Sequence, residues 1–246
     1  MQVEAAKLEK ARALIKKGET EELSRLIEEC PGLTDEKFEP EEEGSLSLTL
    51  LHLAAGYGQE SVPPNALKMI EIITAAGGGS EDRSPAEIAL LCGSTALAGE
   101  LSAGEDLISL AVAAGIGDVD AMATHFESGQ TLVLGEEYIE SGTFRMVKAL
   151  EWPLLLAVKN GQMEAAFYLL KHGADINRLS AEEAGGVAAT PLHWASRHGH
   201  YELVKFLVSY GAGLGNKDDR FRETPSQWAR RAGHEKIADY LSYLAG

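Results

Sequence analysis

The chain has 246 residues and a net charge of −16, with 45% hydrophobic and 24% charged residues. This composition is typical of globular proteins and excludes a collagen-like, disulfide-rich or disordered chain. Charged residues interrupt every apolar stretch before it reaches the ~18 residues of a membrane span, and the charged start of the chain differs from a signal peptide. We therefore expect a cytoplasmic protein, and the sequence leaves export into another cell open.

The negative charge is confined to the first 150 residues. Residues 1–60 hold 14 acidic and 7 basic side chains, residues 61–150 hold 13 and 4, and residues 151–246 hold 11 of each. Such a charge repels nucleic acid and anionic membranes, so we expect neither as a partner. It favours a basic surface on a protein partner, although solubility alone would also explain it.

One segment recurs in the C-terminal part of the chain. Its clearest copies begin with TPLH at Thr190, TPSQ at Thr224 and WPLL after Glu151. The two threonines can cap a helix, and the prolines after them suit the first helical position, where a missing N–H costs nothing. The segment resembles the ankyrin repeat, a unit of ~33 residues that contains a β-turn and two antiparallel helices.

The resemblance implies an all-α fold, an ankyrin-like solenoid of about six helix-turn-helix repeats with β-turn or hairpin fingers. A seventh, degenerate copy would begin at Ser84, which forms a predicted capping box with Glu87. We expect one solenoid over residues 1–246, with a capping repeat and acidic loop at 1–48, divergent repeats with insertions at 49–149, and well-matched repeats with a cap at 150–246. Within the insertions, TLVLGEEYIES alternates enough to predict a β-hairpin. Trp152 is expected to replace the capping threonine of its repeat.

No motif in the sequence predicts catalysis. His52 and His193 occupy the histidine position of the T-P-L-H opening, and the resemblance implies that their rings bond the backbone of an adjoining turn. A zinc site of His193, His198 and His200 would lack the spacing of known sites, although His198 is expected to be exposed. The two cysteines show neither metal nor disulfide spacing. We therefore predict no catalytic residue, no cofactor and no metal.

The resemblance also implies a partner surface, since stacks of this kind present turn tips and the exposed side of each first helix as one concave face. The positions of this sequence that correspond to that face are Tyr57, Glu136, Glu137, Tyr138, Lys159, Asn160, Trp194, Arg197, His198, Arg220, Phe221, Arg222 and Arg231. Arg222 stands where the family usually has a turn glycine. Either the turn is reshaped there or the arginine is retained for contact.

These observations favour a non-enzymatic module that binds one protein partner on its concave face and is a monomer when unbound. One alternative is an acidic inhibitor or immunity-type protein that neutralises a basic toxin or enzyme. Another is an enzyme or enzyme subunit whose repeat insertions form a pocket. A catalytic site of that kind would need titratable side chains that converge in a concavity and have shifted pKa values.

Overall fold

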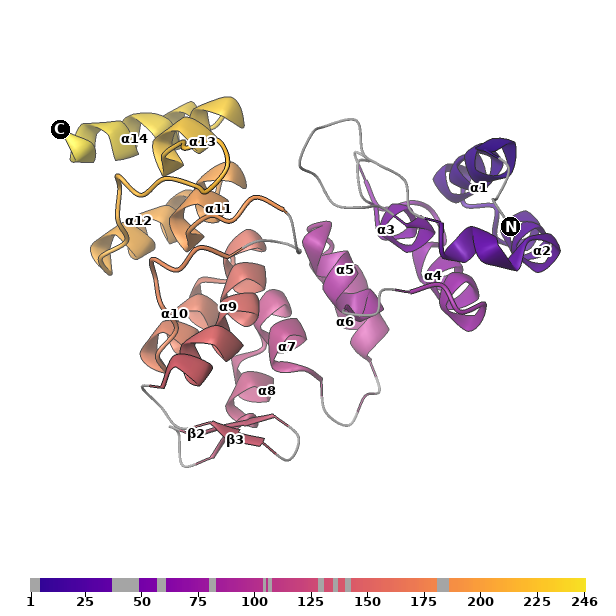
Figure 1. The fold of residues 1–246 in the computed structure, drawn as a ribbon, viewed down its shortest axis with the longest axis horizontal. Coiled ribbons are helices and arrows are strands. Elements are labelled where there is room, and N and C mark those ends of the chain that lie inside the picture. The colour runs from indigo at the N-terminus through magenta and orange to yellow at the C-terminus, as the bar shows by residue number, and fades with distance from the viewer. Residues whose placement is uncertain are drawn as a thin grey trace. The chain divides into compact units, whose positions relative to one another are not determined.

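The protein is described here from a computed structural model, in which helices dominate (Figure 1). The structure describes residues 5–36, 49–56, 61–79, 83–103, 105, 108–127, 131–134, 137–139, 143–180 and 186–246. The chain divides into two compact units, Met1–Glu105 and Asp106–Gly246. Over the described ranges, no helix is both long enough and apolar enough to cross a membrane.

The first unit is built from consecutive helices that pack in pairs. Its helices are α1 (Ala5–Lys17), α2 (Thr20–Glu29), the short 3-10 helix η1 (Pro31–Thr34), α3 (Leu50–Ala54), α4 (Ala66–Ala75), α5 (Pro85–Leu91) and α6 (Thr95–Ser102). The predicted capping box is confirmed, because the Glu87 N–H donates to the Ser84 hydroxyl (3.2 Å) and the Ser84 N–H donates to the Glu87 carboxylate (2.9 Å). The segment from Ser84 therefore does begin a helix pair, formed by α5 and α6.

The second unit continues the helix pairs and adds a small antiparallel sheet. Its elements are α7 (Leu110–Ile116), α8 (Val119–Ala123), β1 (Phe126–Glu127), β2 (Thr131–Leu134), β3 (Glu137–Ile139), α9 (Phe144–Lys159), α10 (Met163–Lys171), α11 (Pro191–Arg197), α12 (Tyr201–Ser209), α13 (Pro225–Arg231) and α14 (Glu235–Ala245). The predicted hairpin is confirmed, with Val133 opposite Tyr138, and β1 extends it to three strands in the order β1-β2-β3. The Phe126 ring anchors this sheet, since it lies 4.4 Å from the His172 ring after α10.

Helix α9 begins earlier than the sequence predicted. Trp152 does not replace a capping threonine, because it lies inside a helix that starts at Phe144 and is capped by the Thr143 hydroxyl, which accepts the Met146 N–H (3.2 Å). The sequence rule that places proline at the first turn favoured Pro153 as the start. The buried side chains of Met146 and Leu150 extend the apolar face of the helix toward its N-terminus, so packing in the second unit stabilises the helix before its internal proline.

Neighbouring repeats in the second unit interlock through a glycine and a histidine. Gly199 has a φ of +77°, and a Cβ added to it would lie 2.6 Å from the His234 ring of the next helix pair. Gly161 meets His200 in the same way, at 2.8 Å. The His200 Nε2 atom also lies 2.7 Å from the Lys159 carbonyl oxygen. Only glycine satisfies both the backbone conformation and the close approach of the ring, so these positions fix how the repeats stack.

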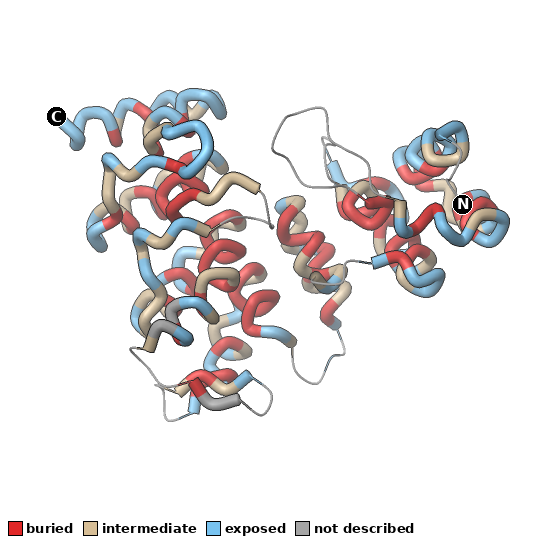
Figure 2. The backbone as a smooth tube through the Cα atoms, viewed as in Figure 1, coloured by how far each residue is buried: buried red, intermediate tan, exposed pale blue. Residues whose placement is uncertain are grey.

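The core of the second unit is one continuous apolar cluster that runs through successive helix pairs. Figure 2 shows that the buried residues follow the inner sides of these helices, while the outer sides are exposed. Because each pair cannot bury its apolar face alone, the stack supplies the core. The last residues of α11 and α13 and the turn before α13 lie at the surface.

Candidate protein-binding surface

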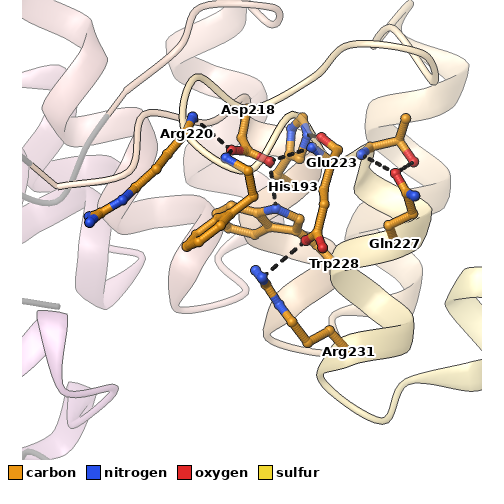
Figure 3. A network of polar contacts seen from close by, with 9 residues as sticks. His193, Asp218, Arg220, Glu223, Gln227, Trp228 and Arg231 are labelled. Carbon is orange, nitrogen blue, oxygen red and sulfur yellow. Dashed lines mark hydrogen bonds and ion pairs between the residues drawn. The ribbon is translucent and has the colours of Figure 1, made fainter. Parts of the chain in front are cut away.

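A buried carboxylate organises the turn that precedes α13. Asp218 is fully buried and accepts the backbone N–H groups of Arg220 (3.0 Å) and Phe221 (2.6 Å) on one oxygen. Its other oxygen accepts the Glu223 N–H (2.8 Å) and the Trp228 indole N–H (3.1 Å). Figure 3 shows this carboxylate at the centre of the network, with the Arg220 side chain extending away from it. The buried Asp218 carboxylate therefore fixes the conformation of the turn.

These donors also set the charge of Asp218. Burial by itself would raise the pKa of the carboxyl, but the N–H groups of Phe221 and Glu223, the Trp228 indole and the Arg220 N–H stabilise the charged form and lower the pKa below its usual value. The side chain is accordingly a charged acceptor at neutral pH. Hydrogen bonds to a charged acceptor are the stronger kind.

His193 connects this turn to the preceding helix pair. Its Nδ1 atom accepts the Thr190 N–H (3.2 Å), so Nε2 carries the proton and donates to the Glu223 carbonyl oxygen (3.0 Å). Burial lowers the pKa of the ring, with the Glu223 carbonyl opposing that shift. The predicted bond from this histidine to an adjoining turn is confirmed. Both nitrogens are used, which leaves the ring without a free ligand atom for a metal.

A row of cations lies at the ends of the first helices, each beside a tryptophan. Lys159, Arg197 and Arg231 are the last residues of α9, α11 and α13. The Lys159 Nζ atom lies 5.8 Å from the centre of the Trp194 ring, and the Arg197 and Arg231 guanidiniums lie 5.8 and 5.6 Å from the Trp228 ring. Such contacts stabilise by about 0.5–1 kcal/mol at exposed sites. The cations therefore occupy equivalent places on successive repeats.

Phe221 extends this row onto the turn. Its ring is 44% exposed, and the guanidiniums of Arg231 and Arg220 lie 4.9 and 5.9 Å from its centre. Arg231 also forms an ion pair with Glu223, at 3.1 Å. The side chains of Arg197, Arg220 and Arg231 are exposed. The structure thus brings the predicted residues of the last two repeats together on one connected surface.

Arg222 adopts the conformation that the resemblance assigns to glycine. Its φ is +58°, in the left-handed region, and the residue is exposed. A residue with a Cβ adopts this region at a cost of roughly 1–2 kcal/mol. Of the two options that the sequence left open, the left-handed backbone of Arg222 favours an arginine retained for contact over a reshaped turn. The residue is strained where glycine would not be.

Four other predicted contact residues are less accessible than the sequence suggested. Trp194 is only 5% exposed, and its indole N–H donates to the Ser180 carbonyl oxygen (3.1 Å), so it supports the surface from below. Lys159 is 8% exposed, and Asn160 is partly buried. His198 is not exposed as expected but partly buried, and burial together with the charges of Lys159 and Arg197 lowers its pKa. Packing between adjacent repeats covers these side chains.

The remaining predicted residues belong to parts that are not fully described. Tyr57 and Glu136 lie outside the described residues. Glu137 and Tyr138 are described only through their backbone, in β3. Their predicted role in binding stays a prediction.

The sequence analysis missed Asp218, which holds the turn together. Its position was visible in the sequence, since this aspartate precedes the TP opening by six residues. An isolated aspartate before a loop is a common turn residue, so nothing in the sequence separated this one from its exposed neighbour Asp219.

The histidines of the described part do not form a site for a metal. Across the described ranges, no group of three or more His, Cys, Asp or Glu side chains could hold a metal ion. The shifted histidines have structural explanations: burial lowers the pKa of His52 to about 4, and its ring bonds the Thr49 N–H (3.2 Å) in the first turn of α3. These shifts follow from packing and capping.

Comparison with known proteins identifies the repeats. Residues 154–245 match the family model of ankyrin repeats, in three copies. The human palmitoyltransferase ZDHHC17 is 36% identical over 66 residues, which are 27% of this chain and 9% of that protein. Palmitoyltransferase AKR1 of Lachancea kluyveri is 30% identical over 86 residues, or 31% and 11% of the two chains. The human ankyrin repeat and KH domain-containing protein 1 is 45% identical over 64 residues, or 26% and 2%.

These similarities are local. The chain spans about a tenth of the length of the palmitoyltransferases that it matches. The match to the family model likewise covers only the C-terminal part of this chain. The comparisons therefore assign the repeats and do not carry over the activity of the larger proteins.

Proposed function

We propose that this chain is a non-enzymatic protein that binds one protein partner. The partner would lie on the face formed by the ends of the first helices and the turns before them. Residues 154–245 are ankyrin repeats, which form a protein-interaction module. The observation that carries this proposal is the connected surface of Arg197, Arg220, Phe221 and Arg231. Arginine and aromatic residues are enriched where binding energy concentrates in interfaces. Here they lie on a rigid support, since a buried hydrogen-bond network fixes the turn below them.

The first 150 residues supply a second feature of the proposed partner. Their excess of acidic side chains would attract a basic surface and accelerate association at low salt. A partner with such a surface would fit an inhibitor or immunity-type role, in which the acidic region covers a basic toxin or enzyme. The same charge makes the association rate depend on ionic strength.

Site-specific photo-crosslinking tests the binding face. A photoreactive benzoylphenylalanine replaces Phe221 in one version of the full chain and Tyr243 in another, and each version is exposed to a lysate of its source cells. Both positions are exposed aromatics, 44% and 85% respectively, so the substitution is comparable. We expect one stoichiometric partner to be crosslinked from the Phe221 position and not from Tyr243.

Two results of this experiment would contradict the proposed binding face. If both positions capture the same set of proteins, or neither captures any, then the face around Phe221 is not a binding face. A captured partner is purified and mixed with the intact chain at low and moderate salt. Weaker binding at moderate salt would support the basic surface that we propose for it.

A further inference from the structure

Three exposed arginines of the last two repeats differ from their basic neighbours in their ion pairing. Within the described residues, no carboxylate pairs with Arg197, Arg220 or Arg222. Other cations of this region do have partners: Arg230 lies 3.6 Å from both Glu235 and Asp239, and several more ion pairs occur along the second unit. The three arginines are thus an unneutralised group.

The group is unusual because the rest of the chain is acidic. The whole chain has a net charge of −16, whereas residues 186–246 hold eight basic and six acidic side chains. Three of the eight bases are these arginines: Arg220 and Arg222 flank Phe221 in the sequence, Arg220 lies 5.9 Å from the centre of its ring, and Arg197 lies 5.8 Å from the centre of the Trp228 ring. A positive surface on an otherwise acidic protein favours an acidic ligand at that surface.

The backbone of Arg222 gives an independent reason to assign this surface a ligand. Its φ of +58° is one that glycine adopts without strain. No ion pair within the described part of the chain involves this side chain. Among the described residues no ion pair offsets this strain, which points to a contact outside the chain.

We propose that Arg197, Arg220 and Arg222 bind an acidic segment of the protein partner, with Asp and Glu carboxylates at the guanidiniums and an apolar side chain against Phe221. The proposal rests on the proposed function and specifies the chemistry of its partner. A guanidinium presents a planar set of donors that matches a carboxylate with two parallel hydrogen bonds. The exposed Phe221 ring, which Arg220 and Arg222 flank in the sequence, provides the apolar contact that a peptide side chain needs.

A single-stranded nucleic acid fits this surface less well. Such ligands need aromatic rings on which bases can stack. The Trp228 ring is only 2% exposed, so it offers no face on which a base could stack. The acidic remainder of the chain would also repel a polyanion.

The experiment uses the full chain as bait for a random library of 12-residue peptides displayed on phage. We expect the selected peptides to be enriched in Asp and Glu next to an apolar residue. A synthetic copy of the most enriched peptide is then measured by fluorescence anisotropy. The variant R197E/R220E/R222E should bind it about ten-fold or more weakly, and the neutral variant R197Q/R220Q/R222Q should fall between this variant and the original chain.

The matched control reverses three lysines on the second helices of the last three repeats, in the variant K171E/K205E/K236E. This change removes the same positive charge but leaves the arginines intact, so we expect affinity to change by less than about three-fold. Circular dichroism of every variant checks that the helices are kept. Equal weakening by both reversals would mean that net charge, and not the arginine surface, determines binding, and would overturn the proposal.

Other outcomes separate this proposal from the proposed function. Selected peptides without acidic residues, together with a partner crosslinked at Phe221, would leave the binding face in place and refute the acidic ligand. Tighter binding of a labelled 12-nucleotide single strand than of any selected peptide would assign the surface to nucleic acid. The absence of any enriched peptide would count against the arginine surface as a peptide site.

Discussion

Replacing Arg222 by glycine should stabilise the protein and weaken partner binding at the same time. The left-handed φ of +58° costs an arginine roughly 1–2 kcal/mol that glycine does not lose. Glycine also makes the unfolded chain more flexible, which offsets about 0.5–1 kcal/mol of that gain. We therefore expect the free energy of unfolding to rise by about 0.5–1 kcal/mol, although the substitution removes a charged side chain that the proposed ligand contacts.

The variant Arg222→Ala separates the backbone from the side chain. It removes the same guanidinium but keeps the left-handed strain, so its free energy of unfolding should stay within about 0.3 kcal/mol of the original chain. Urea denaturation, followed by circular dichroism and tryptophan fluorescence, gives both values. The reasoning would be refuted if the glycine variant were no more stable than the alanine variant. Both variants should lose the same affinity for an acidic peptide, because both lack the guanidinium.

Three further predictions concern the residues that hold the repeats. Asp218→Asn replaces one of the two accepting oxygens by an amide nitrogen that cannot accept, so we expect a loss of about 3 kcal/mol in urea denaturation; a loss under 1 kcal/mol would contradict the network. Gly199→Ala should lower the free energy of unfolding by at least about 2 kcal/mol, because its Cβ would meet the His234 ring. The Cβ of Gly233→Ala would meet no atom within 4 Å, so this variant should lose only about 1 kcal/mol through left-handed strain. Equal losses in the two variants would refute the contact. Folding lowers the pKa of His52 from 6.5 to about 4, so its contribution to the free energy of unfolding is complete above pH 6.5 and declines by about 3 kcal/mol as the pH falls to 4. The difference in free energy of unfolding between the original chain and His52→Gln should follow that profile. A difference that does not vary with pH would contradict it.

The sequence predicted a helix start where a capping side chain is followed by a proline at the first helical position. The Thr190 and Ser84 starts are confirmed because each combines a capping side chain, a proline at the first position and an accepting residue three positions later. The start of α9 was not found in this way, since Pro153 indicated a first helical position although Trp152 before it has no capping oxygen and Leu155 cannot accept a hydrogen bond. There, burial of Met146 within the second unit decides the boundary, and the sequence near the proline does not contain that information.

The candidate surface could be predicted only as a set of positions. The repeat register placed Arg197 and Arg231 at equivalent points, and in the structure both lie beside Trp228. Their accessibility could not be predicted, because it depends on packing between repeats: Trp194 is buried by its neighbours, while Phe221 is held at the surface by the turn. Burial of this kind arises from contacts distant in sequence.

The arrangement around the last turn separates stability from recognition. The carboxylate of Asp218 points inward and satisfies four N–H groups, so substituting it should change both the fold of the turn and the position of the arginines above it. Arg220 and Phe221 donate only their backbone N–H groups to that network, and their side chains are exposed. Substitutions of these side chains should therefore change binding with little effect on stability. A surface built in this way can vary its ligand chemistry while the carboxylate beneath it keeps the turn in one conformation.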